Sequence, residues 1–196
     1  MAPRFPTLRS HDWPDRDGCR PLLPAGPADL PLVSFGAEGI DPDAVVAPCR
    51  TVAAGSGHVV LDYDGPGASE QVLSEARLRA LSARLDSPNL VVCLPHPGRL
   101  FVSTTHPVAV ATLAALGQAA YDVVDRNGGP RLSRRLYFVA AGRITEVFEP
   151  GTLAARRAAG VSARRPEAPG ASPSPPVSSP GASGGVVGWL RRVTGA

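Results

Sequence analysis

The sequence predicts an α+β fold: a single antiparallel or mixed sheet with two helices on one face. Short apolar runs of strand length alternate with two longer segments in which apolar residues recur at helical spacing. Clusters of glycine, proline, asparagine and aspartate separate these segments and indicate turns. From residue 58 onward the order is strand, helix, strand, strand, helix, strand, strand, which contains a split βαβ unit.

The first part of this pattern comprises two strands and a helix. Apolar, strand-favouring residues predict one strand over residues 31–35 and another over residues 58–63. A helix is predicted over residues 74–85, because the Ser74 hydroxyl can accept a hydrogen bond from an amide of the first turn. The apolar face of this helix consists of Leu78, Leu81 and Leu85.

The second part begins with strands over residues 90–94 and 100–103, followed by a helix over residues 105–126 that ends at an Asn-Gly-Gly-Pro sequence. The uncharged run from Leu100 to Tyr121 is long enough to span a membrane. Its hydroxyl, amide, imidazole and proline side chains favour a strand followed by a helix instead. A hairpin over residues 136–148 completes a ferredoxin-like order of elements.

Composition divides the chain into four segments. An irregular lead-in (1–29) precedes the α+β domain (30–150), and a Pro/Gly/Ser/Ala/Arg-rich linker (151–185) that we expect to be disordered leads to a short amphipathic segment (186–196). Residues 1–150 hold 14 arginines against 16 acidic residues, a net charge of −2, whereas the remaining residues hold six arginines against one glutamate, a net charge of +5. The positive charge of the chain therefore belongs to its C-terminal part.

Several classes of function are disfavoured by composition. All 20 basic residues are arginines, which excludes Schiff-base chemistry and a phosphate-binding lysine. Aromatic residues make up only 5%, and no basic stripe with interleaved aromatics indicates nucleic-acid binding. The N-terminus has no apolar signal core and the three cysteines form no disulfide framework, so we expect a cytoplasmic protein, or one peripheral to the inner face of the membrane.

Four residues form a candidate polar site in the domain. Asp62 and Asp64 end a predicted strand, and His96 and Arg99 lie in a turn before another. The strand and its two aspartates resemble the first motif of haloacid-dehalogenase-type phosphatases, in which such aspartates act as nucleophile and acid/base. However, Pro66 stands where that family has a threonine, and the family's lysine is missing. We therefore expect an ordinary strand end, and no catalytic residue is assigned.

Cys93, His96 and His106 are candidate metal ligands, because Cys-x-x-His is a ligand spacing. Cys93 lies within an apolar strand, where a free cysteine usually packs as a small core residue. A closed zinc site would also need a fourth ligand. We therefore expect neither a metal nor a cofactor, and the sequence does not specify an oligomeric state.

The C-terminal segment is the most specific feature of the sequence. As a helix it would place its bulky apolar residues within about 100° of arc and two arginines opposite, the pattern of an amphipathic surface anchor. It resembles the C-terminal membrane-targeting segment of MinD-type ATPases, which implies contact with an anionic membrane surface. The residues expected to contact a membrane or a protein partner are Val186, Trp189, Leu190, Arg191, Arg192 and Val193.

A series of short motifs spans the block from residue 90 to 149. They are Leu94-Pro95-His96, Leu100 to Ser103, Leu132-Ser133, Leu136-Tyr137 and Gly142 before Ile144. With these motifs the block resembles the C-terminal part of an uncharacterised bacterial family typified by YtpQ. That resemblance implies an α+β body and no established activity.

These observations predict a non-enzymatic interaction or regulatory module. The C-terminal segment would tether it to a membrane surface or to a protein partner. Two alternatives are a small enzyme with a polar site near His96 and Arg99, and a chaperone-like protein for a secreted or toxic partner.

Overall fold

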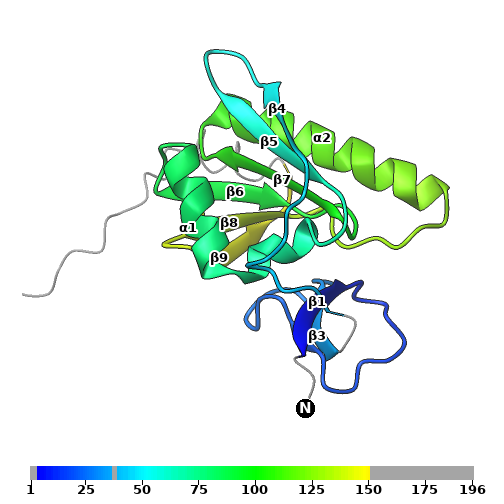
Figure 1. The fold of residues 1–196 in the computed structure, drawn as a ribbon. Coiled ribbons are helices and arrows are strands. Elements are labelled where there is room, and N and C mark those ends of the chain that lie inside the picture. The colour runs from blue at the N-terminus through cyan, green and yellow to red at the C-terminus, as the bar shows by residue number, and fades with distance from the viewer. Residues whose placement is uncertain (1–3, 37–38, 151–196) are drawn as a thin grey trace, which may run out of the picture. The chain divides into compact units, whose positions relative to one another are not determined.

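The computed structural model describes residues 4–36 and 39–150, and the predicted linker (151–185) and amphipathic segment (186–196) lie outside the described residues. The predicted fold class is confirmed, because helices and antiparallel sheets make up the described chain (Figure 1). The prediction of one sheet is corrected, since the strands form two sheets, one with six strands and one with three.

The larger sheet has the strand order β4-β5-β7-β6-β8-β9, and every neighbouring pair is antiparallel. Three of its four inner strands are buried almost throughout, and both edge strands are largely exposed. Its strands are β4 (Cys49–Ala53), β5 (Val59–Asp64), β6 (Asn89–Cys93), β7 (Arg99–Thr104), β8 (Leu136–Ala140) and β9 (Arg143–Phe148).

Two crossover connections interlock in this sheet. Strands β5 and β6 are parallel, with β7 between them, and are joined by helix α1 (Glu75–Arg84). Strands β7 and β8 are also parallel, with β6 between them, and are joined by helix α2 (Pro107–Arg126). The first crossover is the split βαβ unit that the sequence predicts.

The two helices pack on opposite faces of the sheet, which corrects the prediction that they share one face. Leu78 and Leu81 of α1 belong to one apolar cluster, and Val110 and Leu113 of α2 belong to another. Neighbouring strand residues alternate between these clusters, as Leu61 and Val60 do.

The placement of the helices on opposite faces is associated with strand β4. In a ferredoxin-like order the last strand would pair with β5, but β4 occupies that edge, so β8 pairs with β6 instead. The crossover from β5 to β6 and the crossover from β7 to β8 therefore pass across the sheet in the same direction. Their first strands, β5 and β7, are antiparallel to each other. Because crossovers between parallel strands are almost always right-handed, the second helix must lie on the other face.

The smaller sheet corrects the prediction of an irregular lead-in over residues 1–29. Strand β3 (Leu32–Gly36) pairs on one side with β1 (Phe5–Arg9) and on the other with β2 (Arg20–Pro21). Leu8 and Val33 are cross-strand partners, and both are buried in the apolar cluster that contains α1. The sheet is therefore part of the folded core rather than an appendage.

A buried polar chain fixes this sheet to the rest of the domain. The 3-10 helix η1 (Ser69–Leu73) precedes α1 and carries Glu70, which is only 5% exposed. The Glu70 carboxylate accepts hydrogen bonds from the Leu8 amide at 3.2 Å and from the Ser69 hydroxyl at 2.7 Å. Ser69 Oγ in turn accepts from the Gly98 amide at 3.1 Å, so β1, η1 and the turn before β7 are joined.

The ends of both helices follow the sequence predictions closely. The Ser74 hydroxyl accepts a hydrogen bond from the Arg77 amide and caps α1, as predicted. Helix α2 begins at Pro107, a residue suited to a first helical turn. At Gly117, α2 comes so close to β6 that a Cβ atom there would overlap the sulfur of Cys93. A larger side chain at this position would therefore force Cys93 or the helix to shift.

Helix α2 is apolar on its outward face as well as on its packed face. By length and composition alone, α2 could cross a membrane. A stretch of 18 of its residues has a mean hydropathy of 1.3, and 22% of that stretch is buried in the fold. Here it packs on the sheet, and the uncharged run from Leu100 to Tyr121 forms most of β7 followed by most of α2, the strand and helix that the sequence predicts. Its exposed residues include Val108, Ala111, Ala115, Ala119 and Val123. Surface helices usually carry charged residues at such positions.

Candidate functional site

Three of the four residues of the predicted polar site come together at one end of the larger sheet. Asp62 and Asp64 alternate along β5, and Arg99 is the direct cross-strand partner of Asp64 on β7. The Arg99 guanidinium lies 2.8 Å from one Asp62 oxygen and donates a hydrogen bond to the other at 2.9 Å. A further Arg99 nitrogen bonds Asp64 at 2.6 Å. One arginine thus bridges both aspartates.

Arg50 completes this cluster, and the sequence analysis did not assign it. It is the cross-strand partner of Asp62 on β4, and its Nε donates a hydrogen bond to Asp62 Oδ2. The Asp62 side chain is fully buried, whereas that of Arg50 is 69% exposed. Because β4 was not predicted, no sequence signal placed Arg50 beside Asp62.

His96 does not join the other three residues. Its Nδ1 lies 2.7 Å from the carbonyl oxygen of Pro97, so the turn itself orients the ring. It lines a pocket of about 420 Å³ with Asp64 and Glu70, but neither Asp62 nor Arg99 lines that pocket. The predicted four-residue site is therefore divided between an ion-pair cluster and a turn.

The chemistry of the cluster follows from its charges. Asp62 lies between two guanidinium groups, and each of its oxygens is within ion-pair distance of one of them. A carboxylate held in this way is a poor general base, because its lone pairs are already engaged. Among the described residues no group of three or more metal-ligating side chains is found. The arrangement supports a structural ion pair that joins β4, β5 and β7.

A second polar cluster lies on the opposite face of the same strands. Tyr63 and Cys49 are cross-strand partners, and one Arg84 nitrogen donates to the Tyr63 hydroxyl at 3.0 Å and to Cys49 Sγ at 3.5 Å. Burial, together with the neighbouring Cys49, raises the pKa of Tyr63. This cluster attaches the end of α1 to the sheet edge.

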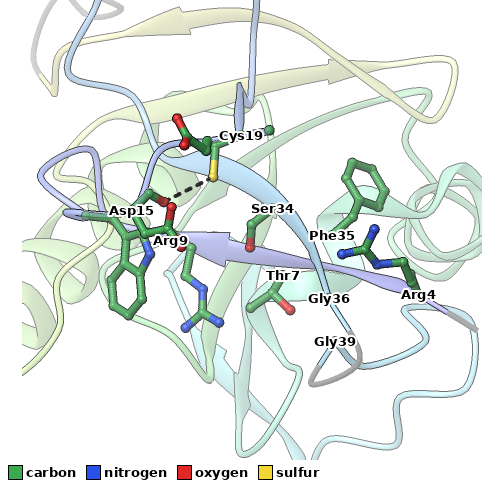
Figure 2. Close-up of a pocket in the computed structure, with 12 residues that line it drawn as sticks. Arg4, Thr7, Arg9, Asp15, Cys19, Ser34, Phe35, Gly36 and Gly39 are labelled. Carbon is green, nitrogen blue, oxygen red and sulfur yellow. Dashed lines mark hydrogen bonds between the residues drawn. The ribbon is translucent and has the colours of Figure 1, made fainter. Parts of the chain in front are cut away.

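The N-terminal sheet bears a pocket of about 670 Å³ on the side away from the core. Thr7, Arg9 and Ser34 line it from the sheet, and Trp13 and Cys19 line it from the loop between β1 and β2 (Figure 2). The Cys19 thiol donates a hydrogen bond to the Asp15 carbonyl at 3.6 Å and so holds this loop in a closed shape. The pocket was not predicted, because the sequence analysis treated the segment as irregular.

The expected membrane or partner contacts, Val186 to Val193, lie outside the described residues. Comparisons with protein-family models, with curated proteins and with solved structures found no match. The resemblances to the YtpQ-like family and to the MinD-type segment therefore stay predictions.

Proposed function

We propose that the chain is a non-enzymatic interaction module that its C-terminal segment attaches to an anionic membrane surface. The observation that carries this proposal is the segregation of Val186, Trp189, Leu190 and Val193 from Arg191 and Arg192 around a helical wheel. A tryptophan beside basic residues is typical of helices that lie at a lipid–water interface.

Magnitudes indicate a weak and reversible attachment. Burial of one tryptophan, one leucine and two valines contributes roughly 5–10 kcal/mol. Two arginines near an anionic surface add about 2 kcal/mol, while ordering ten residues costs about 10 kcal/mol or more. The balance lies near zero, so a single segment would exchange rapidly between membrane and solution. Firm attachment would require a second contact.

The distribution of charge supports the same proposal. The net charge of +5 over residues 151–196 attracts this part of the chain to an anionic surface, and the net charge of −2 over residues 1–150 gives no such attraction. Salt should weaken the attachment, because exposed charges are screened within about 10 Å at 0.1 M ionic strength.

The enzyme alternative has less support from the described residues. It required His96 and Arg99, with Asp62 and Asp64, to converge in one pocket. Instead, Arg99 forms ion pairs with both aspartates, and His96 shares a pocket with Asp64 but not with Asp62 or Arg99. Nothing in this cluster presents a base or nucleophile to a bound substrate.

Vesicle co-sedimentation tests the proposal. The full chain is mixed with vesicles of phosphatidylcholine alone or with added phosphatidylglycerol, and compared with a chain that ends at Gly185. We expect the full chain to sediment with the anionic vesicles only, and the shortened chain to stay in solution. Equal sedimentation of both chains would refute membrane attachment through this segment.

Matched substitutions separate specific contact from general attraction. R191Q together with R192Q removes two charges from the amphipathic segment, and R164Q together with R165Q removes the same charge from the linker. We expect the first pair to reduce sedimentation more than the second. If the full chain binds neither type of vesicle, but captures one defined protein only when the segment is present, the membrane proposal is refuted and the segment binds a protein partner.

A further inference from the structure

The pocket on the N-terminal sheet has the dimensions and lining of a small-molecule site. Its volume of about 670 Å³ lies within the range of about 300–1,000 Å³ that ligand pockets occupy. The register of the sheet determines what faces it: Leu8 and Val33 point into the core, so their neighbours Thr7 and Ser34 point outward. The pocket is therefore built on a sheet with a packed core behind it.

The floor of the pocket presents two hydroxyl groups side by side. Thr7 and Ser34 are direct cross-strand partners on β1 and β3 and lie on the same face of the sheet. Each hydroxyl can donate one hydrogen bond to a ligand oxygen. Two adjacent hydroxyls on a rigid strand pair form a small donor platform.

Two guanidinium groups lie on either side of this platform. Figure 2 shows Thr7 between Arg9 and Arg4, with Ser34 beside it. Arginine presents several donors in a fixed plane and binds carboxylate or phosphate oxygens in pairs. Two arginines with two hydroxyls between them match the oxygens of a phosphate group.

An exposed aromatic ring borders the same pocket. Trp13 remains 38% exposed although the Arg9 guanidinium lies 4.5 Å from the centre of its ring. Phe35 also lines the pocket, but it follows Ser34 on β3 and so extends from the other face of the sheet, where the Arg20 guanidinium lies 5.4 Å from its ring. Exposed aromatic rings at the edge of a polar pocket are suited to stacking against a planar ring. The lining thus combines anion recognition with ring recognition.

Two carboxylates restrict where an anion can lie. Asp15 and Asp17 line the pocket from the loop that contains Cys19. They repel a negative group and accept hydrogen bonds from hydroxyl or amino groups. The anionic end of a ligand is thereby directed toward Arg4 and Arg9, and its donor groups toward the loop.

We propose that this pocket binds a small molecule in which an anionic group and a planar ring are joined by a part with hydrogen-bond donors. A nucleoside monophosphate has this chemistry: the phosphate would lie against the arginines and hydroxyls, the base against Trp13, and the sugar hydroxyls near the carboxylates. The proposal does not depend on the C-terminal segment.

The test uses the full chain with Trp189→Phe, so that Trp13 is the remaining tryptophan. Adenosine monophosphate, adenosine and inorganic phosphate are titrated separately, with Trp13 fluorescence and calorimetry as readouts. We expect saturable quenching by adenosine monophosphate, and affinities about ten-fold or more weaker for the two partial probes, because each makes only part of the contacts.

Substitutions locate the binding on the pocket. Arg4→Gln should weaken adenosine monophosphate and phosphate about ten-fold and leave adenosine unchanged. Arg126→Gln, the same change at an exposed position of α2, should leave all three affinities unchanged. Thr7→Val, which keeps the shape and strand preference of the side chain, should also weaken the phosphate-bearing probes.

Three results would overturn the proposal. The first is the lack of saturable binding of adenosine monophosphate at millimolar concentration. The second is equal binding of adenosine and adenosine monophosphate, since the anion would then contribute nothing. The third is an equal loss of affinity in the Arg4 and Arg126 variants, which would indicate diffuse charge attraction rather than a site.

Discussion

The guanidinium of Arg99 lies 2.8 Å from the carboxylate of Asp62, whose side chain is fully buried, although 37 residues separate the two in the chain. This contact joins two central strands of the larger sheet at their common end. We expect Asp62→Asn to reduce the free energy of unfolding by about 2–4 kcal/mol, because the largely buried Arg99 guanidinium would lose the buried one of its two carboxylate partners and keep only the exposed Asp64. Urea denaturation measures the difference.

Arg50→Gln provides the control for that prediction. It removes the other cationic partner of Asp62, but the Arg50 side chain is 69% exposed, so we expect a loss of only about 1 kcal/mol or less. Equal losses in the two variants would contradict the view that burial decides the strength of these contacts.

The contact between α2 and β6 yields a second prediction. Gly117→Ala places a methyl group against the sulfur of Cys93 and should destabilise the fold by about 1–3 kcal/mol, despite the better helix propensity of alanine. Cys93→Ala removes the sulfur, so the double variant should be more stable than the sum of the single losses predicts. Additive losses in a double-mutant cycle would show that the two positions do not share this contact.

Thiol chemistry provides a third prediction. Cys19 and Cys49 are half-buried, whereas Cys93 is 1% exposed, and burial raises the pKa of its thiol to about 12. In native protein we expect a disulfide reagent to label Cys19 and Cys49, and to label Cys93 only after denaturation. Rapid native labelling at Cys93, located by peptide mapping, would contradict its placement in the core.

The same thiol makes stability depend on alkaline pH. The unfolded thiol ionises near its ordinary pKa of 9.0, while the folded thiol stays protonated to about 12. Its contribution is therefore complete below pH 9 and is lost as the pH rises toward 12. The free energy of unfolding should fall by up to about 1.4 kcal/mol per pH unit for this group. In urea denaturation at alkaline pH, Cys93→Ala should show a shallower decline.

Glu70 leads to a prediction about local stability. Its carboxylate accepts from the Leu8 amide and the Ser69 hydroxyl, so Glu70→Ala leaves both donors without this acceptor. Hydrogen exchange should become faster in β1 and β3 than in β6 and β7, because the smaller sheet loses its polar connection to the domain. Uniform acceleration across both sheets would indicate a global effect instead.

The sequence was sufficient to predict most secondary structure of the domain. Strand β6 begins one residue before the predicted position, and α1 follows the capping serine as expected. Local periodicity and turn residues determine such elements. Strand β4 escaped prediction because it is a five-residue edge strand with only partly buried apolar side chains, so it lacks a regular alternation.

The faces of the helices could not be predicted in the same way. They depend on whether β8 pairs with β5 or β6, and that choice depends on β4, which lies more than 80 residues earlier in the chain. The candidate site shows the same limit. Asp62, Asp64 and Arg99 could be identified by residue type. That they form ion pairs with one another could not, because those contacts depend on the register in which β4, β5 and β7 pair.

The interlocking of the two crossovers has a consequence for dividing the chain. Strand β7 has one neighbour, β5, from before α1 and the other, β6, from after it, whereas both neighbours of β6 follow α1 in the chain. A cut between α1 and β6 would therefore break one strand pair, β5 with β7, and leave β7-β6-β8-β9 contiguous in the second fragment. That fragment would keep α2 on one face of its sheet but lose α1, whose Leu78 and Leu81 share an apolar cluster with Leu90 and Val102 on the other. The first half of the domain thus supplies the cover for a sheet face that the second half cannot bury alone.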